Sequence, residues 1–261
     1  MLNMELDTLF KYQVMKNIIL IFLLTSLILG SCKKAENRSC FKSIGKAAEK
    51  TIELPAFDKL FLKEHIEYIL IQDSTDKLVI KGGENLVNFI HWSIDEDQVL
   101  FIENNNKCNF LRKLNQVITC EIHFTNLSNV QFEGTEPMKS LDTLNVPYFV
   151  LMIRDGAGSV NLKVNSLIIN ADISHGWGDY TLSGKTDFAR ISARSNGFCD
   201  VKDLKIKDSV FVSSETVGKI KVAAEGIPLR GEIKSFGDIW YYGTPSFISV
   251  KEISTGRLIQ Q

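Results

Sequence analysis

A short unit that recurs about every 20 residues between positions 149 and 243 is the feature that most limits how this chain folds. Each unit contains a tight turn followed by a run in which apolar and polar residues alternate, as in a strand with one buried face. One unit alone has nothing against which to bury its apolar face, so consecutive units must stack. The turns recur at Gly158-Ser159-Val160, Gly178-Asp179-Tyr180, Cys199-Asp200-Val201, Gly218-Lys219-Ile220 and Gly237-Asp238-Ile239. The repeat predicts an all-β fold, a largely parallel β-solenoid with coils of roughly 20 residues.

The chain before the repeats alternates in the same way but has no fixed period. We therefore predict a more irregular N-terminal β portion over residues 51–129 and the solenoid repeats over residues 130–261. Within the first portion, Gly82-Gly83-Glu84-Asn85 is expected to open one or two helical turns. Residues 91–104 are expected to form a hairpin with Asp95-Glu96-Asp97 at its tip.

Export is indicated by the residues that precede Cys32. Counted from Met15, the chain has a short cationic start, an apolar run over residues 18–29 and then Gly30-Ser31-Cys32, which are the parts of a secretory signal. The apolar run is too short for a permanent membrane helix, which needs about 20 apolar residues. The last four residues, from Leu29, resemble a bacterial lipobox, which implies that the Cys32 sulfur is lipidated and the chain is cut before it. An ordinary signal with Cys32 there by chance is the less favoured alternative.

The residues on either side of this signal complete the prediction. Glu5 and Asp7 place negative charge where a signal requires positive charge, so we predict that translation starts at Met15 and that residues 1–14 are not made. Residues 1–31 are then the signal, and residues 32–50 the lipidated cysteine and a tether. Lys33 after the cysteine resembles the signal for delivery to the outer membrane, where the protein would face the periplasm or the cell surface.

Composition excludes some functions and leaves others open. A formal net charge of -1 gives no basic field for nucleic acid. The five cysteines include no C-x-x-C pair and form no zinc pattern. A disulfide between Cys108 and Cys120 suits an exported protein, but the spacing does not decide it. The basic residues between positions 107 and 115 would meet an anionic glycan or a lipid headgroup, although a solvated loop is the simpler interpretation.

The turns themselves offer a candidate metal site, which we weigh against turn geometry. Asp179, Asp200 and Asp238 are expected in one column of the solenoid, with Ser159 and Lys219 at the remaining levels. Calcium requires about six to eight oxygen ligands, and the Lys219 cation would interrupt such a column. An aspartate after a turn glycine usually accepts hydrogen bonds from its own backbone. We therefore expect no metal and no cofactor here.

The glycines of these turns have a similar explanation in backbone geometry. We expect the chain to turn sharply, through positive φ, at Gly156, Gly158, Gly176 and Gly178. A dinucleotide-binding loop is not indicated, because no third glycine and no helix follow the G-x-G pairs.

A second column supplies the candidate binding residues. It contains Ala157, Trp177, Phe198, Val217 and Phe236. Aromatic stacks in solenoids usually fill the core, and we expect Phe198 and Phe236 to pack in the core or between neighbouring coils. Trp177 lies between two glycines and beside His175, and it is the best candidate for an exposed aromatic that stacks on a sugar ring. The predicted ligand-binding residues are His175, Trp177 and Asp179.

Catalysis has little support in the sequence. The four histidines are scattered, and neither H-E-x-x-H nor G-x-S-x-G occurs. A polysaccharide lyase or hydrolase would need acids and bases in one groove. The candidates would be Asp155, Asp179, Asp200, His175 and Arg194. We expect the protein not to be an enzyme.

Three stretches of the sequence belong together: Gly82-Gly83-Glu84-Asn85-Leu86, the series of G-x-V/I turns, and the closing stretch from Ser235 to Pro245. Together they resemble the putative auto-transporter adhesin head GIN domain family, whose function is unknown. The resemblance covers residues 53–250. It implies a largely parallel β-solenoid on exported proteins, often lipoproteins, with an adhesin-like name and no assigned catalytic residues. The serine-glycine turns of the family are altered here, as at Ser174-His175-Gly176-Trp177-Gly178, so no binding residue is carried over.

These observations favour a lipid-anchored, non-enzymatic, adhesin-like β-solenoid of the bacterial envelope. Its predicted partners are the membrane, through Cys32, and a glycan or other extended envelope polymer along one solenoid face. Two alternatives remain open at this point: a polysaccharide lyase or hydrolase built on a β-helix, and a purely structural envelope protein.

Overall fold

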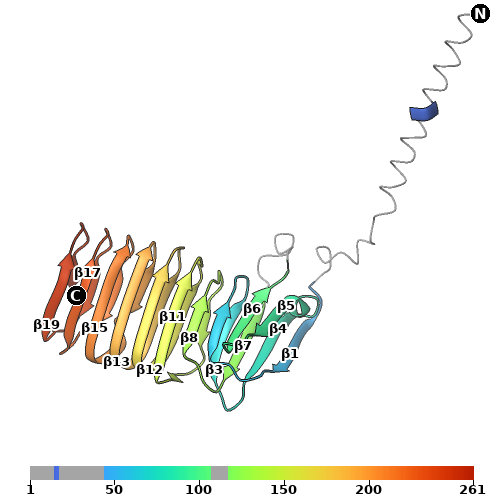
Figure 1. The fold of residues 1–261 in the computed structure, drawn as a ribbon, viewed down its shortest axis with the longest axis horizontal. Coiled ribbons are helices and arrows are strands. Elements are labelled where there is room, and N and C mark those ends of the chain that lie inside the picture. Colours follow the sequence, from blue (N-terminus) through green and yellow to red (C-terminus); the bar gives the residue numbers. More distant parts are fainter. Residues whose placement is uncertain (1–14, 18–43, 107–116) are drawn as a thin grey trace, which may run out of the picture. The chain divides into compact units, whose positions relative to one another are not determined.

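The computed structural model describes residues 15–17, 44–106 and 117–261. The chain divides into a unit over residues 1–43 and a compact unit over residues 44–261, and the description below concerns the second unit. Strands make up 62% of the structure and helix 3%, and the stacked parallel coils form a β-solenoid of about seven turns (Figure 1). The fold predicted from the 20-residue repeat is confirmed. Cys32, Cys108 and the predicted basic loop over residues 107–115 lie outside the described residues.

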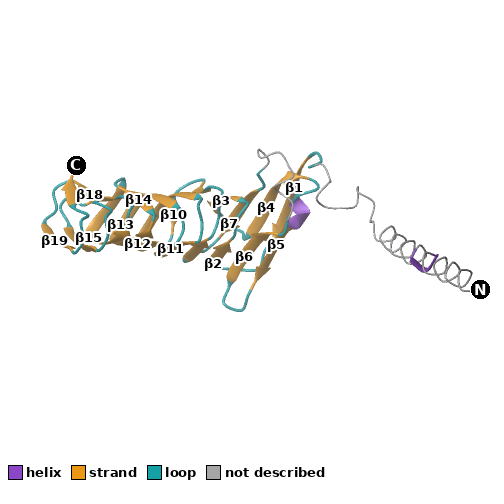
Figure 2. Ribbon diagram, turned by 90° about the horizontal axis from the view of Figure 1, so that it is seen from above, coloured by secondary structure: helices purple, strands orange, loops and turns teal. Residues whose placement is uncertain are grey.

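The coils build two long faces, which Figure 2 shows as two opposed rows of strands. The first face runs, in spatial order, through β5 (Ile90–Ile94), β6 (Val99–Asn104), β2 (Lys59–Leu62), β8 (Asn129–Phe132), β11 (Tyr148–Arg154), the second halves of β12 (Ser159–Ser174), β13 (Asp179–Ser195) and β15 (Leu204–Thr216), then β17 (Pro228–Ile233) and β19 (Phe247–Glu252).

The second face runs through β1 (Ala47–Glu53), β4 (Lys77–Gly83), β7 (Thr119–Phe124), β3 (Glu67–Gln72), β9 (Met138–Ser140), the first halves of β12 and β13, then β14 (Phe198–Val201), β16 (Ile220–Ala223), β18 (Ile239–Tyr242) and β20 (Leu258–Gln260). A short third row joins β10 (Leu144–Asn145) to the middles of β12, β13 and β15. The long strands therefore bend and serve more than one face.

The core lies between the faces and is formed by the inward positions of each strand. One inward column consists of Val160, Tyr180, Cys199, Ile220 and Ile239, which are register neighbours on successive coils and are all buried. Burial of one such side chain stabilises the fold by about 1.5–3 kcal/mol. The column includes a tyrosine and a cysteine among aliphatic residues. The inward orientation of this position is therefore repeated from coil to coil, while the residue type is not.

The N-terminal end of the solenoid is stacked out of sequence order. β2 and β3 lie between β6 and β7 on one side and β8 and β9 on the other, all in parallel register. β4 then pairs antiparallel with β7, β5 pairs antiparallel with β6, and β1 pairs antiparallel with β4. Parallel coils therefore begin inside residues 51–129, and antiparallel strands close this end.

Local predictions for this region can now be compared with the structure. The predicted hairpin is present as β5 and β6. The predicted helical turn is the 3-10 helix Val87–Phe89, preceded by the buried Leu86. β1 begins at Ala47, so the last residues of the predicted tether are strand.

The C-terminal coil is formed by β19 and β20. Among the described residues, β19 pairs only with β17, and β20 pairs only with β18. The inward-facing Ile248 of β19 is 44% exposed, whereas its register neighbour Leu229 on β17 is fully buried. This coil therefore presents apolar core positions and unpaired strand edges to its surroundings.

Candidate functional site

The turns that follow β11, β12, β13, β15 and β17 lie side by side at the upper tips of the coils in Figure 1, and we call this strip the turn edge. It consists of residues 155–158, 175–178, 196–197, 217–219 and 234–238. Neighbouring turns are joined by backbone hydrogen bonds. The N–H of Trp177 donates to the carbonyl of Gly156 at 3.1 Å, and that of Val217 donates to the carbonyl of Ser195 at 2.9 Å. The turn edge is thus a hydrogen-bonded ladder that fixes the backbone from which its side chains project.

Positive φ on the turn edge falls mainly on residues other than glycine. Asp155, His175 and Ser195 occupy the same position on three successive coils, with φ of 52°, 62° and 59°. Asp and His are among the non-glycine residues that accept this conformation more readily. Of the four glycines for which we predicted positive φ, only Gly176 has it, at 93°.

The other three glycines serve close packing of the coils. A Cβ on Gly158, for example, would lie 2.3 Å from the carbonyl oxygen of Glu136. The prediction of positive φ was wrong at these three positions, where φ is not positive. Glycine is needed there because neighbouring coils approach too closely to leave room for a side chain.

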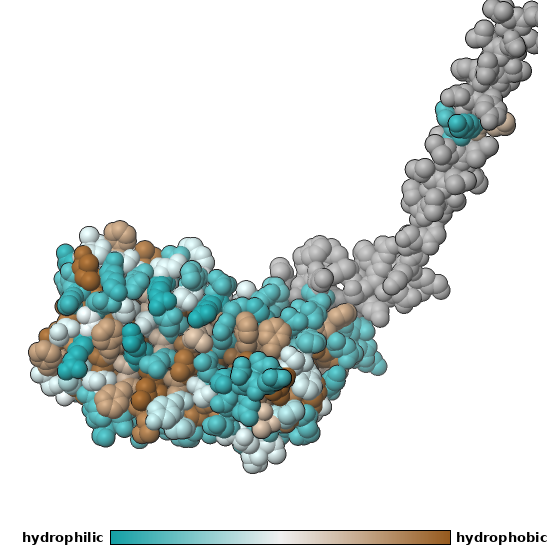
Figure 3. Space-filling model, in the orientation of Figure 1, coloured by the Kyte–Doolittle hydropathy of each residue, from teal (hydrophilic) through white to brown (hydrophobic). Residues whose placement is uncertain are grey.

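Large apolar side chains project from the turn edge on successive coils. Trp177 is 73% exposed, Val217 55% and Phe236 68%, while Phe198, at the start of β14, is 52% exposed. Figure 3 shows hydrophobic side chains among polar ones at the upper tips of the C-terminal coils. The expectation that Phe198 and Phe236 pack in the core is wrong: both side chains are exposed, and the buried inward positions that follow them are Cys199 and Ile239.

The aspartate column is also corrected by the register. Asp179 lies beside Ser159 on one coil and Phe198 on the next, while Asp200 lies beside Thr181 and Lys221. The cause is a shorter turn: Phe198 follows Ala193 by one residue less than Asp179 follows the equivalent Ile173. The three carboxylates do not stack. Within the described parts of the chain, no group of three or more His, Cys, Asp and Glu side chains is placed to hold a metal ion.

A groove of about 400 Å³ opens beside the turn edge on the second face. Asp179, Phe198, Asp200, Lys219 and Lys221 are among its lining residues. Burial raises the pKa of the Asp179 carboxyl above its ordinary value. The Lys221 ammonium donates a hydrogen bond to Asp200 Oδ2 at 2.9 Å. The groove combines an exposed aromatic ring with hydrogen-bonding groups, which is a surface suited to binding.

A cation–π contact beside the groove was not found from the sequence. The Lys219 Nζ lies 3.1 Å from the centroid of the Trp240 ring. Trp240 is the register neighbour of Lys221, one coil away. When the repeats are aligned by the observed register, Lys219 lies on the neighbouring coil, two residues before the partner of Trp240. This alignment is the sequence signal from which the contact could have been predicted.

The predicted site residues occupy two parts of this region. His175 and Trp177 lie in the same turn, and both are exposed. Asp179 is the first residue of β13 and lines the groove. Their role in binding stays a prediction.

Two of the predicted catalytic candidates have structural partners. Arg194 forms an ion pair with Asp172, with 3.6 Å between Nη2 and Oδ1. Asp200 is held by Lys221. Burial raises the pKa of Asp172, and the nearby Arg194 cation opposes that shift. Each of these two ion pairs joins neighbouring coils, which gives Arg194 and Asp200 a structural role.

The two described cysteines are buried, free thiols on β7 and β14. Burial raises the pKa of the Cys120 thiol to about 12, and burial also raises the pKa of Cys199. Thiols in this state are poor nucleophiles. Because Cys108 lies outside the described residues, its pairing with Cys120 is a prediction for which the structure gives no support.

Over residues 15–17, 44–106 and 117–261, no helix has the length and apolar character to span a bilayer.

Comparison with known proteins identifies relatives at the level of family and fold. The model of a family described as "Putative auto-transporter adhesin, head GIN domain" matches residues 56–245. No curated protein matches the chain.

Several solved structures share the fold. A putative adhesin from Bacteroides fragilis superimposes with a TM-score of 0.73 at 20% identity, covering 83% of this chain and 97% of the other. A putative adhesin from Parabacteroides distasonis gives a TM-score of 0.52 at 19% identity, covering 83% and 98%. A protein from the same organism, described as a putative lipid binding protein, gives 0.53 at 16% identity, covering 83% and 97%. At these identities the likeness concerns the fold alone.

Proposed function

The chain belongs to the putative auto-transporter adhesin, head GIN domain family, and we propose that it is a non-enzymatic, adhesin-like protein of the cell envelope that binds an extended partner along its turn edge. The family name and the similar solved structures support an adhesin-like protein at the envelope or surface. The binding surface and the ligand class are our proposal.

The observation that carries this proposal is the row of exposed apolar side chains on the turn edge. Soluble proteins rarely expose such rows without a binding partner. Trp177 and Phe236 offer flat faces, and hydrogen bonds between neighbouring turns hold the backbone beneath them. A ligand therefore would not have to order these turns, which lowers the entropic cost of binding.

A glycan fits this surface better than a compact ligand. The row crosses several coils, and neighbouring strands lie about 4.8 Å apart, so the ligand must be extended. His175, in the same turn as Trp177, and Asp179, in the adjoining groove, supply hydrogen-bonding groups, and sugar rings need both polar and aromatic contacts.

The attachment to the membrane is proposed from the sequence. Cys32 would carry the lipid, and dual acylation there would anchor the protein stably, whereas a single chain binds only marginally. Replacement of Cys32 by Ala should move the protein out of the membrane fraction. Detection in cells of a peptide spanning residues 1–11 would contradict translation from Met15.

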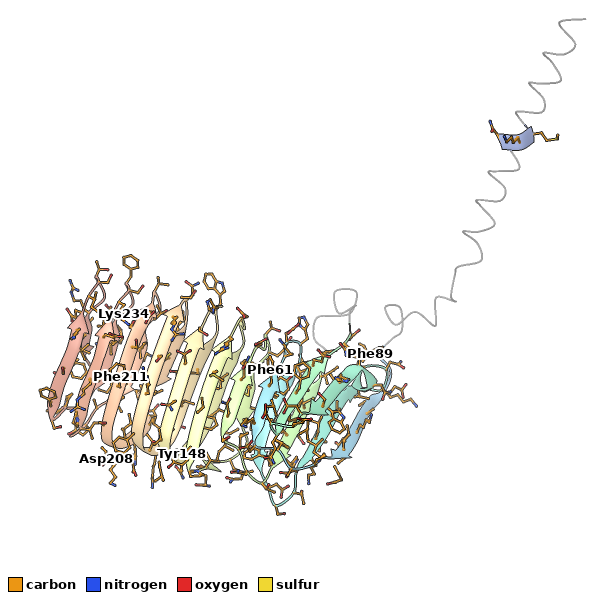
Figure 4. The ribbon with its side chains drawn as sticks, viewed as in Figure 1. Phe61, Phe89, Tyr148, Asp208, Phe211 and Lys234 are labelled. Atoms are coloured by element: carbon orange, nitrogen blue, oxygen red, sulfur yellow. The ribbon has the colours of Figure 1, made fainter. Side chains whose placement is uncertain are left out.

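A glycan screen with the full chain tests the binding proposal. For any glycan that binds, Trp177→Ala and Phe236→Ala should each weaken the affinity by about 1 kcal/mol, roughly fivefold, through lost stacking. The matched control is Tyr148→Ala, which removes another exposed aromatic side chain (55%) at the opposite ends of the strands, as Figure 4 shows. Equal losses for Tyr148→Ala would contradict a site on the turn edge, and shortening of the glycan would contradict the non-enzymatic assignment.

A further inference from the structure

The corner at which β13 and β15 bend carries lysines on adjacent coils. Lys185 and Lys205 are direct register partners, and both are exposed. Adjacent strands are about 4.8 Å apart, so the backbones hold the two side chains next to each other. In the described part of the chain, neither ammonium group has an ion pair or a side-chain hydrogen bond. Two like charges at this spacing repel each other.

A β-bulge at the same corner adds a third lysine. The register of β13 and β15 shifts between Thr186 and Phe188, so that Lys207 and Asp208 together lie opposite Asp187. The Lys207 Nζ lies 3.8 Å from Asp187 Oδ1 and 4.0 Å from Asp208 Oδ1, and it is only loosely neutralised. Figure 4 labels Asp208 at the lower ends of the strands, away from Lys234 at the upper tips. Bulges often redirect side chains beside functional sites.

These lysines line a hollow that crosses coils. One groove of about 340 Å³ contains Lys185, Lys205 and Lys207, with Asn165 and Asp187 at its sides. A second groove of about 340 Å³, lined by Lys202, Asp203 and Glu225 among others, shares Lys205 and Ile206 with the first. We call these two adjoining grooves the trough. The first contains three lysines and one acid, and the second contains two lysines and two acids.

Exposed ammonium groups at this spacing repel each other weakly in water, and an anion bound between them would remove that repulsion. An oxyanion with several oxygens would accept charge-assisted hydrogen bonds from two ammonium groups at once. We propose that this trough binds sulfate, phosphate or carboxylate groups carried along a linear polymer, which follows the trough from coil to coil. The site lies at the other ends of the strands from the turn edge, and its test does not depend on the proposed function.

Binding of dextran sulfate to the full chain, kept in a neutral detergent, tests this site, with uncharged dextran as the reference. We expect binding of dextran sulfate alone, with an affinity that falls as salt is added. The double substitution Lys185→Gln and Lys205→Gln should weaken binding by at least about tenfold. The matched control is the double substitution Lys50→Gln and Lys251→Gln, which removes two exposed lysines elsewhere and the same net charge. This control should bind as the original chain does.

Thermal unfolding separates loss of the site from loss of the fold. Because the Lys185 and Lys205 double variant relieves repulsion, its Tm should equal or exceed that of the original chain. Equal weakening in both double variants, or no binding of dextran sulfate at low salt, would overturn the proposal. Binding to phosphatidylglycerol vesicles but not to dextran sulfate would assign the lysines to lipid headgroups and would overturn the proposal of a polymeric ligand. Trp177→Ala should leave dextran sulfate binding unchanged.

Discussion

The two ends of the solenoid solve the same physical problem in different ways. A stack of coils always has a first and a last core layer, and strand edges there carry unpaired N–H and C=O groups. At the N-terminal end, antiparallel β1, β4 and β5 close the stack, and the buried Leu86 and Val87 cover the core. At the other end, β19 and β20 leave core positions partly exposed. The comparison teaches that the closing elements need not belong to the repeat.

The sequences of the two outer strands follow this difference. β1 has the sequence AAEKTIE, in which charged residues protect an edge from pairing with other chains. β19 has the sequence FISVKE, which begins with two exposed apolar residues. We therefore expect the two ends to differ in local stability, and the following predictions test this from the largest expected effect to the smallest.

Amide hydrogen exchange should show the largest difference. Amides of β4 and β7 are expected to exchange through global unfolding, while those of β19 and β20 open locally, with opening free energies lower by several kcal/mol, on the order of 3–5. Mass spectrometry of peptides from the two regions would measure this. Equal protection in both regions would show that the C-terminal coil is as firmly held as the closed end.

Truncation of one isoleucine at each end should give unequal losses. Ile80 on β4 is fully buried, so Ile80→Ala should lower the free energy of unfolding by about 2–5 kcal/mol. Ile248 is partly exposed, and Ile248→Ala should cost less than about 1 kcal/mol. Denaturant titrations of both variants give the comparison. A loss at Ile248 as large as that at Ile80 would mean that another surface covers the last coil.

Surface aromatics should show the same trend on a smaller scale. Phe61 and Phe101 lie edge to face on β2 and β6, with ring centroids 5.3 Å apart. Phe61→Ala should therefore cost about 0.5–1.5 kcal/mol. Phe247 on β19 is 54% exposed, and Phe247→Ala should change stability by less than about 0.5 kcal/mol. Thermal unfolding of the pair would contradict the comparison if Phe247→Ala proved the more harmful.

Acid should act on the N-terminal end through Asp73. A hydrogen bond from the Ser74 N–H, followed by the His123 side chain, lowers the pKa of Asp73 from 3.8 to about 2. A lowered carboxyl pKa stabilises the fold above pH 3.8, and this contribution is lost as the pH falls toward 2. Asp73→Asn should therefore flatten the loss of stability over this range. An unchanged acid titration in the variant would exclude this carboxylate as a cause.

The sequence was sufficient for the fold class but not for the alignment of every coil. Alternating strands and the recurring turns predicted stacked parallel coils because periodicity depends on local residue pattern. The register at Phe198 could not be predicted, because the spacing between partners changes along this coil. Partners lie 19 residues apart at Phe198, 20 apart at Leu204, and 21 apart after the bulge at residues 207–208. These compensating changes keep the average period near 20 residues. Similarly, the exposure of Phe236 depends on which neighbour faces inward, and hydrophobicity alone does not reveal this.

The candidate site was predicted in part, for related reasons. Trp177 stood out because glycines flank it, and it is exposed. The lysine trough was not predicted, although Lys185 and Lys205 are 20 residues apart and the period of the repeat places them on adjacent coils; that spacing was the available signal. The bulge that brings Lys207 beside them, in contrast, leaves no local pattern in the sequence.

The out-of-order stacking of β2 and β3 has a consequence for how the chain folds. Asp58, just before β2, contacts Ser128 across 70 residues, whereas Asn165 reaches its neighbour Asn145 across 20. The entropy of loop closure must be overcome before a distant contact forms, so high contact order slows folding. The regular coils can add one after another from a local start. The first coil in sequence, however, is completed only when β8 and β9 arrive, so the earliest strands of the solenoid wait for a partner that is synthesised much later.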